Sequence, residues 1–319
     1  MNKKRKNIIN SNKVSMVKEF NLNGYPQKVL IEGKSEDLPI LITLHAGPGT
    51  PIPFCVGSRG LFPEITDKCI LVCWDQYGCG INNAILPDTL TINDYVDMTI
   101  DLIKEMKNLY PSNPIWLFAM SWGSILSAKV AVKVPELIDG VISYGQVLNR
   151  LMTSDEAIDT LMNSKAPEKT KKVLKDFLDS KTFNKDMVMK LSNTMKKYTY
   201  GYNNPNEPSI NIGSMIWGLL TSPDYKFKDF KAMMVNGYLK NNSLFEELFK
   251  IDISKELSAV TLPYHIIQGD TDIVTSTTDI KNFVEKSDNS NLTCQVIKDS
   301  AHLPGANGMD AVFEKINNL

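Results

Sequence analysis

Short hydrophobic runs alternate along this chain with longer stretches of helical periodicity. The runs that predict buried strands cover residues 39–45, 69–74, 114–120, 137–144, 262–268 and 292–297. Two further runs flank an Asn23-Gly24 turn and predict an antiparallel hairpin at residues 14–20 and 27–32. Apolar residues at helical spacing predict helices over 91–109, 122–134 and 277–285, and a last helix from about 308.

This alternation predicts an α/β fold with a mostly parallel central sheet covered by helices on both faces. It stops at about residue 147, where helical patterns follow at 154–162, 169–178, 185–198 and 228–239. Strands resume at 262, so we expect a helical cap or lid over 147–240, inserted between core segments 1–146 and 241–319. The stretch 200–208, with its Gly, Asn and Pro residues, predicts a hinge within that cap.

The composition is ordinary for a globular protein, with 43% hydrophobic and 22% charged residues among 319. A net charge of -1 gives no reason to expect nucleic acid or an acidic membrane as a partner. No stretch reaches the roughly 18 to 20 apolar residues of a membrane span, and the first residues lack a signal-peptide pattern, so we expect a cytoplasmic protein. The basic residues at 3–6 are expected to form a solvated tail.

Cysteines and histidines narrow the candidate chemistry. The five cysteines are odd in number and form no CxxC pair, which predicts reduced structural thiols. The three histidines are scattered, so no metal site is predicted and no cofactor is expected. His265 lies within a predicted strand and is expected to pack there, whereas His45 stands beside a Gly- and Pro-rich loop that it is expected to brace. His302, in a loop after the last strand, is the candidate base.

A serine stands where a predicted strand meets a predicted helix. In Ala119-Met120-Ser121-Trp122-Gly123, small residues two before and two after the serine permit the sharp turn of a nucleophile elbow. An acidic residue follows the strand at 262–268 and His302 follows the last strand. The carboxyl ends of parallel strands share one edge of a sheet, so we expect these side chains to meet there as nucleophile, orienting acid and acid–base catalyst.

Two aspartates compete for the role of the acid. We favour Asp272 over Asp270, because it lies further beyond the strand end and can turn toward His302. Asp270 is the alternative, and it is expected to shape the turn.

Several motifs, in this order, resemble those of the proline iminopeptidase-like α/β-hydrolases. His45-Ala46-Gly47-Pro48-Gly49 is similar to their HGGPG loop, Asp75-Gln76-Tyr77-Gly78-Cys79-Gly80 to their DQRGxG, and residues 119–123 to their GxSWG elbow. Residues 269–272 resemble their GxxD, and residues 300–302 their final histidine loop. The resemblance implies an α/β-hydrolase fold, an oxyanion hole formed by the backbone N–H groups of Gly47 and Trp122, and support of the site by Asp75 and Gln76.

Three positions depart from the family pattern, because Ala46, Tyr77 and Ala119 replace a glycine, an arginine and a glycine. In the family's peptidases, acidic cap residues bind the free amino terminus of the substrate; the candidates here are Glu156, Glu207 and Asp224.

The sequence therefore predicts a serine hydrolase that acts through an acyl-enzyme on small amide or peptide substrates, in the manner of a prolyl aminopeptidase. Its expected partner is a small-molecule or short-peptide substrate. The alternative is a carboxylesterase on small esters. The remaining hypotheses are a non-catalytic ligand-binding protein on this fold and a cofactor-free lyase or haloperoxidase-like enzyme with the same triad.

Overall fold

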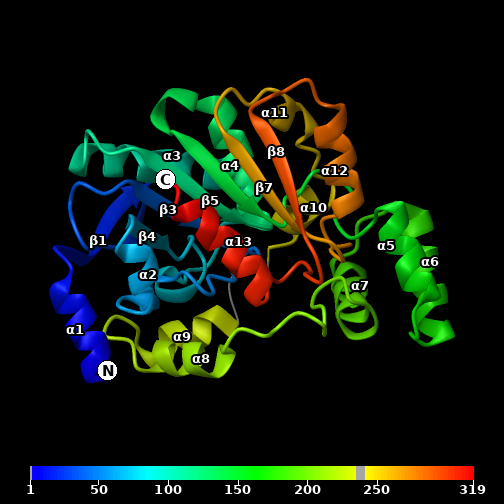
Figure 1. The fold of residues 1–319 in the computed structure, drawn as a ribbon. Coiled ribbons are helices and arrows are strands. Elements are labelled where there is room, and N and C mark those ends of the chain that lie inside the picture. Colours follow the sequence, from blue (N-terminus) through cyan, green and yellow to red (C-terminus); the bar gives the residue numbers. More distant parts are fainter. Residues whose placement is uncertain (1, 235–240) are drawn as a thin grey trace.

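The computed structural model describes residues 2–234 and 241–319, and within them one sheet of eight strands forms the centre of the molecule (Figure 1). The strands are β1 (Val14–Leu22), β2 (Tyr25–Gly33), β3 (Ile40–Leu44), β4 (Ile70–Trp74), β5 (Ile115–Met120), β6 (Gly140–Tyr144), β7 (Tyr264–Gly269) and β8 (Leu292–Ile297). Their order across the sheet is β1-β2-β4-β3-β5-β6-β7-β8. β2 pairs antiparallel with β1 and β4, and all other neighbours are parallel, which confirms the predicted mostly parallel sheet.

Strand β6 starts later than predicted, at Gly140 instead of residue 137. Residues Pro135–Leu137 form a 3-10 turn, so this part of the hydrophobic run is not strand. Asp139 places the start of β6 beside β5. Its N–H donates to Ile115 O at 2.8 Å, and its carboxylate accepts from Ile115 N at 2.7 Å. Strands β3, β4 and β6 are buried at every residue, as parallel strands covered on both faces must be.

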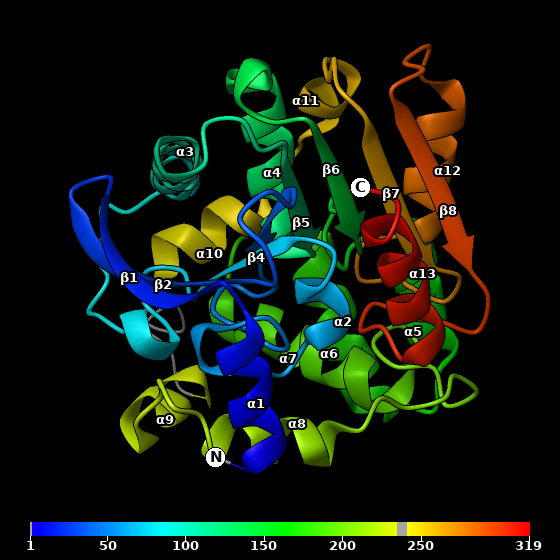
Figure 2. The same ribbon diagram turned by 60° about the vertical axis from the view of Figure 1, so that its left-hand side comes forward.

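Helices cover both faces of the sheet (Figure 2). One face carries α3 (Ile92–Leu109), α4 (Trp122–Lys133), α11 (Ser254–Ser258) and α12 (Thr277–Lys286), and the other carries α2 (Pro63–Thr66) and α13 (Ala306–Ile316). α3 begins after Thr91, whose N–H donates to the Asp94 carboxylate at 2.8 Å while its hydroxyl accepts from Asp94 N at 3.3 Å. This reciprocal pair is a capping box, and it explains why the helix starts where the sequence predicts.

A helical segment lies between β6 and β7. Its helices are α5 (Asp155–Asn163), α6 (Glu168–Ser180), α7 (Lys185–Tyr198), α8 (Ile212–Leu220), α9 (Phe227–Met234) and α10 (Asn242–Phe249). α8 and α10 are absent from the sequence prediction, and residues 235–239 of the helix predicted at 228–239 lie outside the described residues. The segment leaves and rejoins the core at one place, where Ile253 N donates to Leu148 O at 2.9 Å and Asn149 bridges Asp252. Its division from the core as a cap at 147–240 stays a prediction.

The basic residues near the amino terminus do not form a frayed tail: Lys3, Lys4 and Lys6 are exposed as predicted, but the prediction is wrong for Arg5, which is buried. They lie in α1 (Lys3–Ser11), which packs beside α8 and α9 at one end of the molecule (Figure 2). Arg5 is only 4% exposed, because its guanidinium donates to Gly57 O at 2.8 Å, to Arg59 O at 2.6 Å and to Gly218 O at 2.5 Å. In the described part of the chain, no helix is both long and apolar enough to cross a membrane.

Candidate active site

Ser121 occupies the sharp turn between β5 and α4. Its backbone has a φ of 49° and a ψ of -113°, a conformation that costs a non-glycine residue about 1 to 3 kcal/mol. Its N–H donates to Tyr144 O at 3.0 Å, at the end of the neighbouring strand β6. A Cβ at Gly123 would stand 2.1 Å from Leu44 O of β3, so only glycine permits this close approach of helix and strand.

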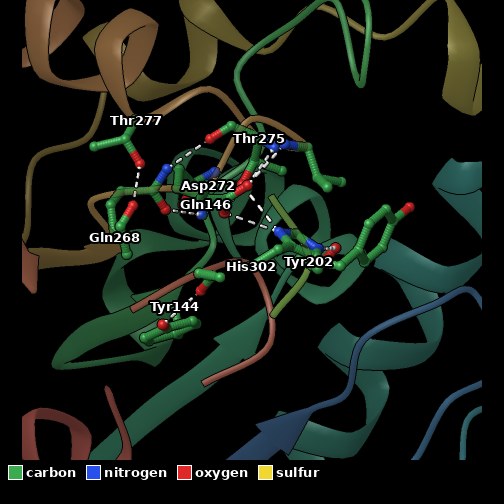
Figure 3. A network of polar contacts seen from close by, with 12 residues as sticks. Tyr144, Gln146, Tyr202, Gln268, Asp272, Thr275, Thr277 and His302 are labelled. Carbon is green, nitrogen blue, oxygen red and sulfur yellow. Dashed lines mark hydrogen bonds and ion pairs between the residues drawn. The ribbon is translucent and has the colours of Figure 1, made fainter. Parts of the chain in front are cut away.

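His302 joins Ser121 to Asp272. His302 Nε2 lies 2.9 Å from Ser121 Oγ. His302 Nδ1 lies 2.9 Å from Asp272 Oδ2 (Figure 3). The aspartate and the histidine are shielded from water, since Asp272 is 1% exposed and His302 6%. The geometry fits a neutral imidazole that donates its Nδ1–H to the carboxylate and accepts the hydroxyl proton at Nε2.

Of the two competing aspartates, the structure brings Asp272 to the histidine. Its Oδ1 accepts from Val274 N at 2.8 Å and Thr275 N at 2.9 Å, and its Oδ2 accepts from Thr275 Oγ1 at 2.7 Å. These bonds orient the carboxylate toward His302. Asp270 is exposed, and its N–H donates to Ile297 O at 2.9 Å at the end of β8.

Buried polar side chains behind Ser121, His302 and Asp272 hold the loops of this site, and no sequence motif marks them (Figure 3). Gln268 accepts from Gln146 N at 2.7 Å and donates through Nε2 to Thr275 O at 2.7 Å, which holds the turn that carries Asp272. The Tyr144 hydroxyl lies 2.8 Å from Ala301 O and holds the loop that carries the histidine. Glutamines and a tyrosine at strand ends carry no distinctive sequence signal, so only the fold reveals these roles.

The His302 loop is also bound to the inserted segment. His302 N–H donates to Gly201 O at 3.0 Å, and Leu303 N–H donates to Tyr202 O at 2.9 Å. The Tyr202 ring stands edge-on to the imidazole, with the ring centroids 5.8 Å apart. The stretch 200–208, for which the sequence predicts a hinge, therefore lies against the loop that carries His302.

His45 braces the glycine loop, as expected. Its Nδ1 donates to Ala46 O at 2.8 Å, and its Nε2 accepts from Gln76 N at 3.0 Å, so both ring nitrogens are occupied. Burial lowers the pKa of His45 to about 4, which keeps the imidazole neutral. The side chain of Gln76 binds the residue after Ser121, because its Oε1 accepts a hydrogen bond from Trp122 Nε1 at 2.8 Å.

Asp75 connects three segments of chain. Its wholly buried carboxylate accepts from Val56 N and Ile81 N at 2.9 Å each, and also from the Tyr225 hydroxyl of the inserted segment. Burial raises the pKa of Asp75 to about 6, and these three hydrogen bonds oppose that rise. The side chain does not line the cavity beside Ser121, so it supports the surrounding loops from behind.

The two expected oxyanion donors lie in suitable local structures. Trp122 N is the first N–H of α4, a position that has no partner within the helix. Gly47 has a φ of 133°, and a Cβ there would stand 2.3 Å from Gly49 N, so the loop requires glycine. Gly47 and Ser121 line one cavity. Their joint role at an oxyanion stays a prediction.

Each departure from the family motifs fits its surroundings. The extra methyl groups of Ala46 and Ala119 are buried, with exposures of 8% and 0%, and pack in the core on either side of the sheet. Tyr77 packs its ring against Tyr25 of the hairpin, with centroids 4.4 Å apart. The hairpin therefore provides an apolar partner for the tyrosine that replaces the family's arginine.

Ser121 and His302 open into a cavity of about 280 Å³. Most of its wall is apolar and comes from the inserted segment: Leu151, Met152, Val188, Met189, Phe245 and Phe249. Its polar contributors beyond Ser121 and His302 are Thr50, Ser192 and Tyr202, and no Asp or Glu of the described ranges lines it. Nowhere in the described ranges do three His, Cys, Asp or Glu side chains gather in a way that could hold a metal ion.

The three acidic residues considered for amino-terminus binding do not reach this cavity. Glu207 accepts from the Ser300 hydroxyl, and Asp224 pairs with the Arg59 guanidinium. Glu156 lies exposed on α5. None of them is placed to contact a substrate at Ser121, so that expectation is wrong for all three.

Comparison with known proteins agrees with the motifs. A family model described as "alpha/beta hydrolase fold" matches residues 39–307. The chain is similar to "Probable aminopeptidase YbaC" of Bacillus subtilis, at 22% identity over 299 residues, 91% of this chain and 92% of the relative. It is also similar to a "Proline iminopeptidase" of Thermoplasma volcanium, at 28% identity over 141 residues, 43% of this chain and 44% of the relative. The crystal structure of proline iminopeptidase from Mycobacterium smegmatis shares the fold, with a TM-score of 0.64 at 15% identity over 95% of this chain and 97% of that one.

Proposed function

This chain belongs to the α/β-hydrolase fold family, and we propose that within it the protein is a serine hydrolase that forms an acyl-enzyme at Ser121. The observation that carries the proposal is the 2.9 Å contact between His302 Nε2 and Ser121 Oγ. A serine hydroxyl is a poor nucleophile until a neighbouring neutral imidazole accepts its proton. The contact of His302 Nδ1 with Asp272, also 2.9 Å, supports the same assignment, because the carboxylate selects the useful tautomer.

The reaction follows from these positions. Ser121 Oγ attacks the substrate's carbonyl carbon while its proton passes to His302 Nε2, and Asp272 stabilises the resulting imidazolium. The N–H groups of Gly47 and Trp122 bind the tetrahedral oxyanion, each contributing roughly 3 kcal/mol to lowering the barrier. The imidazolium then protonates the leaving alcohol or amine as its bond to the carbonyl carbon breaks. A water molecule attacks the acyl-serine by the same route and releases the carboxylic acid.

Two substrate classes are compatible with this chemistry. The names of the relatives, an aminopeptidase and proline iminopeptidases, favour amino-terminal residues of peptides, as in a prolyl aminopeptidase. The apolar cavity without a carboxylate favours uncharged esters or amides.

Fluorophosphonate labelling followed by intact mass measurement tests the activated serine. We expect one adduct on the wild-type protein and none on Ser121→Ala. An adduct that persists on Ser121→Ala would place the reactive group elsewhere. The absence of an adduct on the wild-type protein would contradict the proposal and favour a non-catalytic ligand-binding protein.

A further inference from the structure

Among the described residues that line the cavity beside Ser121, none is a Lys, Arg, Asp or Glu. Side chains of Met189 on α7 and Phe245 and Phe249 on α10 form much of its wall. Two of the hydroxyls that reach it are paired with each other, since Ser192 Oγ lies 2.6 Å from the Tyr202 hydroxyl.

No carboxylate is available there to balance a positive charge. Asp272 is the acid nearest to the catalytic residues, and its oxygens already receive bonds from two backbone N–H groups, the Thr275 hydroxyl and His302. Glu207 and Asp224 are each bound to residues away from the cavity. The residues outside the described part, 1 and 235–240, contain no Asp or Glu in their sequence, so they cannot supply one.

This matters because an aminopeptidase must bring an ammonium group next to the scissile carbonyl. The ammonium lies on the α-carbon of the acyl group, so it enters the cavity together with that group. Removing an ammonium from water into apolar surroundings is strongly unfavourable unless an anion or several acceptors replace the water. An acyl group without this charge instead gains from burial, by about fourfold in affinity for each methylene.

We propose that Ser121 accepts a small, apolar acyl group that carries no charge at its α-carbon. The substrates are then esters or amides of short carboxylic acids, and not peptides with a free amino terminus. The inference rests on the proposed serine hydrolase function and specifies its substrate class.

Two esters that differ only in the ammonium test the proposal: 4-nitrophenyl propionate and the 4-nitrophenyl ester of L-alanine. At pH 6 the amino group of the alanyl ester is protonated. We expect kcat/KM of the wild-type protein, divided by each ester's spontaneous hydrolysis rate, to favour propionate by about tenfold or more. A preference for the alanyl ester would overturn the proposal.

A matched pair of variants locates the acyl group. Met189→Glu adds a carboxylate to the cavity wall, and Met189→Gln adds an amide of nearly the same shape. For each variant we compare kcat/KM for the alanyl ester with kcat/KM for the propionate ester. We expect this ratio to be about tenfold higher in Met189→Glu than in Met189→Gln. If the alanyl-to-propionate ratio of kcat/KM is identical in the two variants, the acyl group does not occupy this cavity.

Labelling of Ser121 separates this proposal from the proposed function. If Ser121 is labelled by fluorophosphonate but propionate is not hydrolysed, the substrate class is wrong while the serine hydrolase assignment stands. If Ser121 is not labelled and neither ester is hydrolysed, the proposed function itself fails.

Discussion

Glu207 and Ser300 form a contact that links the inserted segment to the loop of His302. Ser300 stands two positions before His302 in the sequence. Its hydroxyl lies 3.0 Å from each oxygen of the Glu207 carboxylate. Gly308 N, in the first turn of α13, donates to the same carboxylate at 2.9 Å. A candidate for substrate binding therefore holds the loop that carries His302.

Replacing Glu207 is expected to affect the loop and not the choice of substrate. Glu207→Ala leaves the Ser300 hydroxyl and Gly308 N without this acceptor, so we expect a loss of about 1 to 3 kcal/mol in the free energy of unfolding and a lower kcat. The kcat/KM ratio between the propionyl and alanyl esters should stay unchanged. Urea unfolding and ester kinetics measure both effects, with Asp159→Ala, a change at an exposed acidic residue of α5, as the control. A changed ratio would mean that Glu207 binds substrate.

The aspartate that orients the histidine can be identified with a pair of variants. In Asp272→Asn an amide faces His302 and favours the wrong tautomer, so we expect kcat to fall roughly 10³- to 10⁴-fold. Asp270→Asn alters an exposed side chain, and we expect less than a twofold change. Steady-state kinetics on one ester, with circular dichroism to verify folding, decides the matter. Equal losses in the two variants would contradict the assignment.

The elbow glycine should tolerate no side chain. In Gly123→Ala the new Cβ meets Leu44 O, a backbone atom that cannot yield without moving β3. We therefore expect destabilisation by about 2 kcal/mol or more and loss of fluorophosphonate labelling. Ala119→Gly is the control at the other small position. It removes one buried methyl group, and we expect a cost of about 1 kcal/mol with labelling retained. Full labelling of Gly123→Ala would contradict the structure of the turn.

The pH dependence of stability should depend on His45. Its pKa falls from 6.5 in an unfolded chain to about 4 in the folded protein. Above pH 6.5 the neutral ring contributes fully to stability, and this contribution of about 3 kcal/mol is lost as the pH falls toward 4. His45→Asn keeps a donor for Ala46 O but cannot titrate. We expect its free energy of unfolding to decline by about 3 kcal/mol less than that of the wild type between pH 7 and pH 4. Urea unfolding at a series of pH values measures this difference. If the free energies of unfolding of the wild type and of His45→Asn decline in parallel between pH 7 and pH 4, the prediction is wrong.

Arg5 should stabilise the contact between α1 and α8. Arg5→Met keeps most of the apolar stem but leaves the Gly57, Arg59 and Gly218 carbonyls without their donor. We expect the free energy of unfolding to fall by about 1 to 3 kcal/mol and proteolysis within 212–220 to become faster. Lys6→Met changes an exposed neighbour and serves as the control. Equal proteolysis of the two variants would argue against this contact.

The sequence identifies elements whose signals are local. α3 has a periodic apolar stripe and a capping pair, and its observed bounds match the prediction closely. α8 is not predicted, because Gly213 and Gly218 each lower helix propensity by about 1 kcal/mol and only tertiary contacts compensate for this. The burial of Arg5 cannot be predicted from its basic neighbours either, since its acceptors lie 52, 54 and 213 positions away along the chain.

The candidate site likewise contains residues that local sequence patterns predict and residues whose contacts are distant along the chain. Ser121, Asp272 and His302 each follow a hydrophobic run, so the topology of a parallel sheet is enough to bring them to one edge. The function of Glu207 depends on a contact with Ser300, 93 positions further along the chain. An acidic residue in a helical insertion gives no sign of such a partner, and the family resemblance suggested a different role for it.

The junction at which Ile253 N donates to Leu148 O has a consequence for how relatives of this chain can diverge. Since the helical segment enters and leaves the sheet through adjacent residues, its length and sequence place little constraint on the spacing of β6 and β7. Recombination can therefore transplant a foreign segment of another size at this point, provided that the new segment replaces the contacts of Gly201, Tyr202 and Glu207 with the His302 loop. Such an exchange would rebuild the walls of the cavity beside Ser121 in a single step, and the polar contacts to the His302 loop would be the part of the segment that has to be kept.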